Sequence, residues 1–95
     1  MVQRVKMKES VIQKKIIDLV RSHGGYIIKV ITATSSGVPD LIACVKGKFI
    51  AIEVKTPTGI ISPLQERNIK QIHKAAGVGI IARSVEEVED LLSTI

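Results

Sequence analysis

The 95-residue sequence has a single cysteine, Cys44, and only two aromatic residues, Tyr26 and Phe49. One cysteine excludes a disulfide framework and a zinc site built from several cysteines. Two aromatics argue against a stacking platform for single-stranded nucleic acid, which uses several. No apolar run reaches the ~18 residues that a membrane span needs, and nothing resembles a signal peptide. These absences predict an intracellular, cytoplasmic protein without a membrane partner.

Acidic residues are also scarce over most of the chain. Nine acidic residues stand against 14 basic ones, for a net charge of +5 and a pI near 9.6. Four of the nine lie in residues 84–95, which contain no lysine or arginine. The remaining body therefore has 14 basic and five acidic side chains, a surplus that suggests a polyanionic partner. Many small proteins are basic for no specific reason, so charge alone does not decide the partner.

The 45% apolar content is that of a packed globule rather than of a disordered basic tail. The length predicts a single domain over residues 1–95, and its last part, 84–95, is expected to be an acidic C-terminal helix. Apolar spacing, capping residues and turn residues predict the order αβββαβα. The expected elements are a helix at 9–22, strands at 26–34, 40–45 and 48–55, a helix from 63 to about 76, a strand at 78–82 and a helix that begins at Ser84.

The turn at Lys46-Gly47 suggests a hairpin between the second and third strands. With a loop of two or four residues, Asp40 faces Glu53 on one side of the sheet, and Lys55 shares that side. An odd loop would place the two carboxylates on opposite faces. The other residues of both strands are apolar on both faces, which is typical of a sheet covered by helices on each side. Cys44 is accordingly expected in the core.

Two carboxylates directly opposed on a sheet repel each other unless a proton or a divalent cation lies between them. Oxygen ligands of this kind suit Mg²⁺, and a neighbouring lysine can hold a water or stabilise developing charge. The competing interpretation is a solvated strand face, with Asp40 as an ordinary turn residue after Pro39. The histidines, His23 and His73, lack metal-ligand spacing and are expected on the surface.

Three strings in order, GVPDLIA (37–43), KFIAIEVKTPTG (48–59) and SPLQ (62–65), strongly resemble the virus-type replication-repair nuclease (VRR-NUC) domain. This is a branch of the PD-(D/E)xK nuclease superfamily, and the resemblance covers about residues 9–83 and indicates the stand-alone phage or bacterial type. It implies an α/β restriction-endonuclease-like fold with a mixed four-stranded sheet flanked by helices, in agreement with the predicted order.

The resemblance also implies roles for individual residues. Asp40 and Glu53 match the metal-binding carboxylates, and the backbone carbonyl of Val54 matches a further ligand. Lys55 matches the lysine that orients or activates the attacking water, while Gln65 matches a glutamine in the helix after the sheet. Glu9 matches an acid on the first helix that supports the metal directly or through water. Two of these residues have simpler explanations: Glu9 as a first-turn helix acid and Gln65 as part of a capping box behind Ser62.

The implied activity is an Mg²⁺-dependent DNA endonuclease, in which Mn²⁺ substitutes and no small-molecule cofactor is needed. A chain this small has few side chains for reading bases, which favours recognition of DNA shape. Two-fold pairing would present two active sites to two strands, so the sequence-based hypothesis is a homodimeric Holliday-junction resolvase acting in DNA repair. The alternatives are a flap, nick, single-strand or restriction-like nuclease, and a non-catalytic DNA-binding module of the same fold. A more distant one is an adaptor that uses the acidic residues 86–90.

Overall fold

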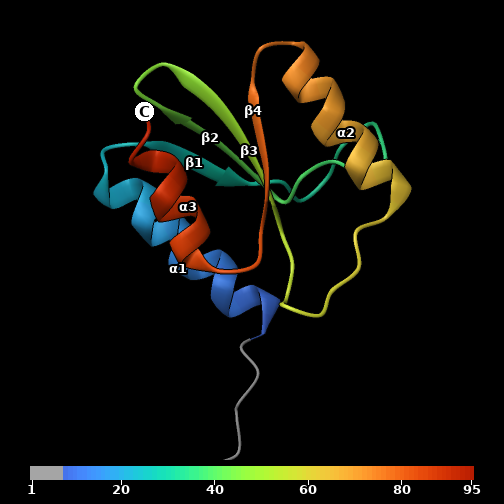
Figure 1. Ribbon diagram of the computed structural model, residues 1–95, viewed down its shortest axis with the longest axis horizontal. Coiled ribbons are helices and arrows are strands. Elements are labelled where there is room, and N and C mark those ends of the chain that lie inside the picture. Colours follow the sequence, from blue (N-terminus) through green and yellow to red (C-terminus); the bar gives the residue numbers. More distant parts are fainter. Residues whose placement is uncertain (1–7) are drawn as a thin grey trace, which may run out of the picture.

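The computed structural model describes residues 8–95, which fold as a four-stranded sheet between helices (Figure 1). The elements are α1 (Glu9–Ser22), β1 (Tyr26–Lys29), β2 (Leu41–Val45), β3 (Lys48–Val54), α2 (Pro63–Lys74), β4 (Val78–Ala82) and α3 (Val85–Leu92). The sheet order is β1-β2-β3-β4; β1, β2 and β3 are antiparallel neighbours, and β4 runs parallel to β3. The predicted αβββαβα order and mixed sheet are confirmed.

Helices α1 and α3 lie on one face of the sheet and α2 lies on the other (Figure 1). The core forms under α1, where Ile12, Ile16 and Val20 recur at helical spacing and are almost completely buried. They pack with alternate residues of the strands, among them Leu41 and Ile52. Alternate strand residues point to the same side of a sheet, so the intervening residues face α2. None of the helices in residues 8–95 is both long and apolar enough to cross a membrane.

A two-residue turn fixes the register of the β2–β3 hairpin. Lys46 and Gly47 both have positive φ angles, of 50° and 78°, as a turn matched to the twist of a hairpin requires. Val45 pairs with Lys48, and at the far end of the ladder Leu41 pairs with Ile52. The even register expected from the sequence is therefore confirmed. Asp40 and Glu53 lie one step beyond the Leu41–Ile52 pair, and both face the opposite side of the sheet from that pair.

The first strand is shorter than its β-branched sequence suggests. The prediction of a strand over 26–34 was wrong for its second half, because β1 ends at Lys29. Val30 still donates its N–H to the carbonyl of Asp40 at 2.8 Å, but no residue of β2 lies beyond that point. A strand needs a hydrogen-bonding partner along its length, so β propensity alone could not extend β1.

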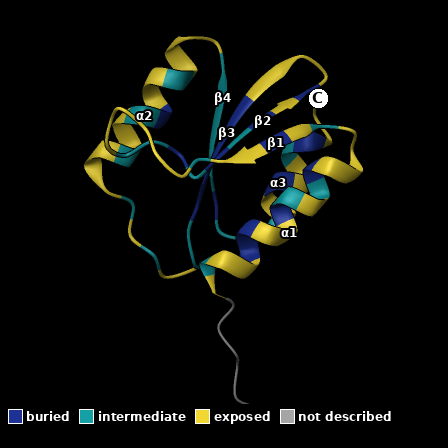
Figure 2. Ribbon diagram, turned by 180° about the vertical axis from the view of Figure 1, so that it is seen from behind, coloured by how far each residue is buried: buried dark blue, intermediate teal, exposed yellow. Residues whose placement is uncertain are grey.

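Cys44 is exposed, which corrects its assignment to the core. The expectation that helices cover both faces fails over β1 and β2 on the α2 side, where exposed residues appear in Figure 2. A helix is about 10 Å wide and strands lie about 4.8 Å apart, so one helix covers roughly two strands. Helix α2 contacts β3 and β4, which leaves a row of side chains uncovered on β1, on β2 and at the start of β3. These residues, here called the open sheet face, are Tyr26, Ile28, Cys44 and Phe49.

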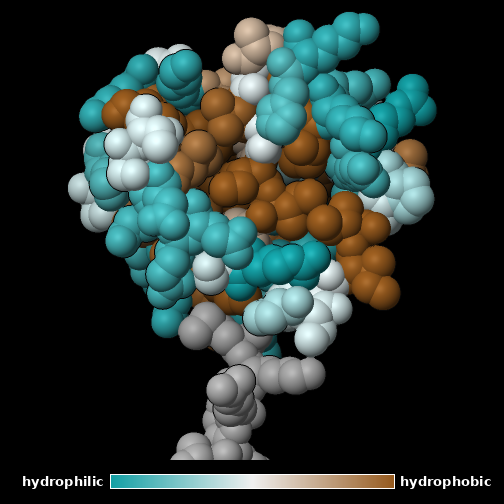
Figure 3. Space-filling view, viewed as in Figure 1, coloured by the Kyte–Doolittle hydropathy of each residue, from teal (hydrophilic) through white to brown (hydrophobic). Residues whose placement is uncertain are grey.

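The sheet also has an open edge at β4. Strand β4 is the last in the sheet order, and residues 78–81 are only partly buried. In the space-filling view, hydrophobic side chains gather along the middle of the molecule between the hydrophilic surfaces on either side (Figure 3). His73 is exposed, as predicted, and its Nε2 lies 2.8 Å from the carbonyl oxygen of Gly79 on this strand. Side chains of α2 therefore cover part of the edge.

Candidate active site

Two carboxylates meet where β2 begins and β3 ends, on the face that α2 covers. Asp40 immediately precedes β2 and is half-buried, whereas Glu53 is only 2% exposed. One Asp40 oxygen, Oδ2, accepts a hydrogen bond from the backbone N–H of Val54 at 3.0 Å. In a strand the N–H and C=O of one residue point to the same side, so the Val54 carbonyl also faces toward Asp40. Three potential oxygen ligands thus converge from the two strands.

The two oxygens of the Glu53 carboxylate differ in their polar contacts. Its Oε2 accepts a hydrogen bond from Gln65 Nε2 at 3.2 Å and lies 3.7 Å from Lys55 Nζ. Its Oε1 is buried and has no hydrogen-bond partner among residues 8–95. Burying a carboxylate oxygen without a hydrogen-bond partner lowers the stability of the folded protein. Such an oxygen is therefore expected to bind a proton or a ligand such as a cation.

The environment raises the pKa of Glu53 to about 7 from an ordinary 4.5. Burial is the largest cause, followed by the negative charge of the neighbouring Asp40. Lys55 opposes the shift, and the charge of Glu9 adds the smallest contribution to it. Two acids held together in this way share a proton near neutral pH unless a cation replaces it.

Gln65 combines both of the roles considered for it from sequence. Its Oε1 accepts from the backbone N–H of Ser62 and its own N–H donates to Ser62 Oγ, which together form a capping box at the start of α2. The other end of the same amide reaches Glu53. The cap therefore orients the amide that holds the carboxylate.

The loop before Asp40 is anchored to α2 by contacts that the sequence did not reveal. Gly37 has a φ of 77°, and a Cβ added there would lie 2.7 Å from the backbone carbon of Leu64. Asn68 donates from Nδ2 to the carbonyls of both Ser36 and Leu64, at 3.1 and 2.9 Å. A side chain at position 37 would force the loop away from the helix, so Gly37 and Asn68 together set the distance between Asp40 and Gln65.

Glu9 occupies a more peripheral position than the other predicted residues. It is the first residue of α1, is half-buried, and is close enough for its charge to act on Glu53. Within residues 8–95, no three histidine, cysteine or acidic side chains cluster closely enough to form a metal site by themselves. The structure brings Asp40, Glu53, Lys55 and Gln65 together, and leaves Glu9 at the margin of the group.

These residues fit a hard divalent cation. Mg²⁺ is commonly bound through one or two carboxylates and keeps several waters or substrate oxygens. Two carboxylates, one strand carbonyl and an unpartnered buried oxygen on Glu53 meet that requirement without a third acid.

Comparison with known proteins gives the family of the chain. The model of the VRR-NUC domain matches residues 6–86, which include all the residues described above. The chain belongs to the VRR-NUC family. A curated relative, "Putative nuclease p44" of Acyrthosiphon pisum secondary endosymbiont phage 1, is 30% identical over 90 residues, which span 94% of this chain and 96% of the relative.

Solved structures confirm the fold of this VRR-NUC chain. One VRR-NUC domain superimposes with a TM-score of 0.79 at 25% identity, over 90% of this chain and 94% of its own. A second VRR-NUC domain protein gives 0.75 at 15% identity, over 94% and 88%. The Archaeoglobus fulgidus Holliday junction resolvase Hjc gives 0.60 at 19% identity, over 77% and 65%. The predicted PD-(D/E)xK-like architecture is thereby confirmed.

Proposed function

We propose that this VRR-NUC protein is a metal-dependent, structure-specific DNA endonuclease, and that its substrate is a four-way (Holliday) junction. The observation that carries the proposal is the Asp40–Glu53 pair. In the part of the chain that the structure describes, a buried Glu53 oxygen lacks a hydrogen-bond partner, and Lys55 lies 3.7 Å from the other oxygen. Membership of a nuclease family and a fold shared with a junction resolvase support it.

Each residue of the candidate site has a defined role in this proposal. Asp40, Glu53 and the carbonyl of Val54 hold Mg²⁺ or Mn²⁺, with Glu9 supporting the site through water. The cation, when bound, supplies a Lewis acid for the scissile phosphate and lowers the pKa of water. Lys55 orients the attacking water, and Gln65 keeps the Glu53 carboxylate in place. Since ligands must be deprotonated, the raised pKa of Glu53 makes metal binding weaken below neutral pH.

The distribution of charge favours DNA on the α2 side. The carboxylate pair lies on the α2 face of the sheet, whereas the acidic helix α3 packs beside α1 on the opposite face. The four acidic side chains of residues 84–95 are thus kept from the approaching phosphates. With few base-reading groups available, contacts to phosphates would select DNA by shape rather than by sequence.

A DNA panel tests the proposal. Junction, flap, nicked, linear and single-stranded DNA would be incubated with Mg²⁺, and with chelator as the control. We expect cleavage of the junction, no cleavage with chelator, and no cleavage by Asp40→Ala, Glu53→Ala or Lys55→Ala. The two acid variants should bind DNA as well as or better than the parent, because a charge that repels phosphate is removed. Glu89→Ala, on exposed α3, is the matched control.

The panel also separates the alternatives. Preferential cleavage of flaps, nicks or single strands would replace the junction as substrate while keeping the enzyme class. DNA binding without any cleavage would indicate a non-catalytic module. Cleavage by either acid variant at the parental rate would mean that the site is misassigned.

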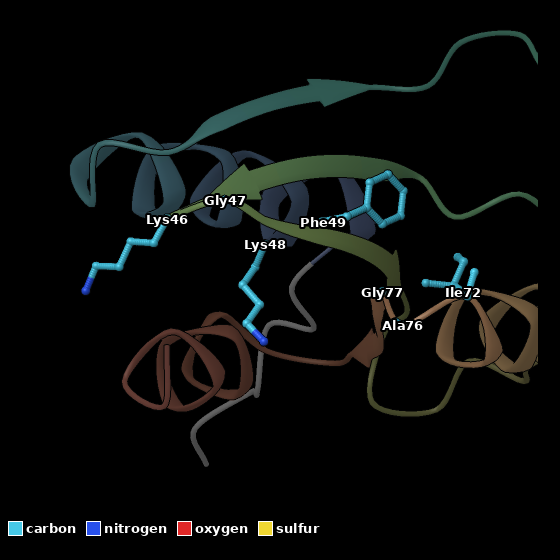
Figure 4. Close-up of a pocket in the computed structure, with 8 residues that line it drawn as sticks. Lys46, Gly47, Lys48, Phe49, Ile72, Ala76 and Gly77 are labelled. Atoms are coloured by element: carbon cyan, nitrogen blue, oxygen red, sulfur yellow. The ribbon is translucent and has the colours of Figure 1, made fainter.

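We further propose that the protein acts as a homodimer in which the open sheet face is buried. Tyr26 and Phe49 are 68% and 46% exposed there, and exposed apolar patches of this kind often mark interaction surfaces. In Figure 4, Phe49 points toward the side of Ile72, whereas Lys46 and Lys48 point away, so the lysine charges leave the apolar ring free to pack. Two active sites related by a two-fold axis suit two symmetric cuts.

Light scattering at micromolar concentration measures the dimer directly. The measured mass of the parent should be twice that of one chain. The substitutions Tyr26→Lys and Phe49→Lys should lower the measured mass toward that of the monomer. Val11→Lys is a matched control, because Val11 is similarly exposed, at 42%, but belongs to α1, which lies on the other face of the sheet. A monomeric parent that still cleaves junctions would refute the dimer without refuting the endonuclease.

A further inference from the structure

Arg83 directs its side chain into the protein rather than toward a partner. It follows β4 and is half-buried. Its Nη1 donates to the carbonyl oxygens of Thr56 at 2.7 Å and Gly59 at 2.8 Å, with that of Pro57 at 3.4 Å. Its backbone N–H donates to Glu87 Oε1 at 3.2 Å, which fixes the other end of the residue to α3. One guanidinium nitrogen thus contacts three carbonyl oxygens of a single loop.

That loop is in contact with Lys55. It begins directly after Lys55 and turns at Thr56–Gly59, where the Gly59 N–H donates to the Thr56 carbonyl at 3.0 Å. The turn lies so close that a Cβ on Gly59 would stand 3.4 Å from Lys55 Cδ and 3.2 Å from Thr56 Oγ1. The backbone N–H of Lys55 also donates to the carbonyl of Ala82, the residue before Arg83. The end of β4, the turn and the lysine stem therefore form one packed unit.

We propose that Arg83 is a positioning residue that holds the Thr56–Gly59 turn against Lys55 and thereby fixes the lysine amine beside Glu53. This rests on the proposed nuclease function, in which Lys55 orients the attacking water. Hydrogen bonds from a charged donor are roughly twice as strong as neutral ones, which suits an arginine at a cluster of carbonyls. The lysine side chain is only 15% exposed, and the turn lies beside its stem.

The obvious rival is that Arg83 contacts a DNA phosphate like other basic residues. The two roles differ in what they predict. Loss of a phosphate contact weakens binding and lowers the slope of log affinity against log salt by about 0.9 for duplex DNA. Loss of a positioning contact leaves affinity and slope unchanged, and slows cleavage by bound enzyme. A misplacement of 1 Å in an active site can cost about 100-fold in rate.

The test compares Arg83→Gln and Arg83→Lys with the control Arg21→Gln, an exposed arginine in the last turn of α1. Single-turnover cleavage of the best substrate, DNA affinity at several salt concentrations and the unfolding midpoint would be measured. We expect Arg83→Gln to cleave about 10- to 100-fold more slowly at saturation, with affinity and salt slope unchanged. Arg83→Lys should recover part of the rate because it keeps a charged donor. Arg21→Gln should cleave at the parental rate.

Two results would overturn the inference: parental cleavage by folded Arg83→Gln, or a rate loss that vanishes at saturating enzyme with a reduced salt slope. If Arg83→Gln fails to fold, Gly59→Ala tests the same turn from the loop side. It should slow cleavage without changing affinity, because its Cβ would stand 3.2 Å from Thr56 Oγ1, close enough to shift the turn beside Lys55. An unchanged rate would count against the inference. A parent inactive on every DNA in the panel would refute the proposed function instead.

Discussion

Replacing Glu53 with glutamine should change how stability depends on pH. The substitution keeps the size of the side chain and makes it permanently neutral, as the protonated glutamic acid is. The folded protein holds a proton on Glu53 up to about pH 7, whereas the unfolded chain releases it near 4.5. Because the folded state binds more protons in this interval, the stability of the parent should fall as pH rises from 4.5 through 7.

The size of the effect follows from the pKa. At 1.36 kcal/mol per pKa unit, a pKa raised from 4.5 to about 7 corresponds to roughly 3 kcal/mol. In the absence of metal, Glu53→Gln should match the parent near pH 4.5 and exceed it by up to roughly 3 kcal/mol at pH 8. Because Glu53 and Asp40 interact, the difference between the two curves reports the titration of the carboxylate pair.

Urea unfolding followed by circular dichroism, with chelator at pH 4.5 to 8, measures this difference. Glu66→Gln is the control, because Glu66 lies 61% exposed on α2 and its charge remains in water. Added Mg²⁺ at pH 8 should stabilise the parent and leave Glu53→Gln almost unchanged. A difference that stays constant across the pH range would refute the argument from burial, and equal stabilisation by Mg²⁺ would remove Glu53 from the metal ligands.

Three further predictions concern the elements around the site. Gly37→Ala should lower the unfolding free energy by at least 1 kcal/mol, as measured by urea unfolding, because its φ is 77° and the new methyl would meet the backbone of α2; full stability would contradict the close approach. Ser62→Ala should cost about 1 kcal/mol in the same assay and reduce cleavage, because the capping box also orients Gln65; unchanged stability would mean that the cap is dispensable. Cys44 should react with a thiol reagent in the folded monomer as fast as in urea, and protection at concentrations that favour the dimer would place it in the interface.

Much of the fold could be predicted because its signals are local. The Lys46-Gly47 turn and the apolar runs on either side specify the hairpin, and pairing in steps of two then places Asp40 opposite Glu53. Ser62, Pro63 and Gln65 mark the start of α2 within four residues. The strand over 26–34 failed because pairing, and not propensity, ends β1 at Lys29.

The sequence by itself determined the order of elements, the register of the acids and the excess of positive charge on the body of the chain. Only the tertiary structure decided how those acids behave. Gln65 contacts Glu53, Asn68 anchors the loop at Ser36, and Arg83 binds the carbonyl of Thr56. Each of these contacts joins residues that are 12 or more positions apart in the sequence. Likewise, Cys44 is exposed because the single helix α2 is too narrow to cover four strands. Such contacts depend on where chain segments meet in space, which local patterns of residues do not specify.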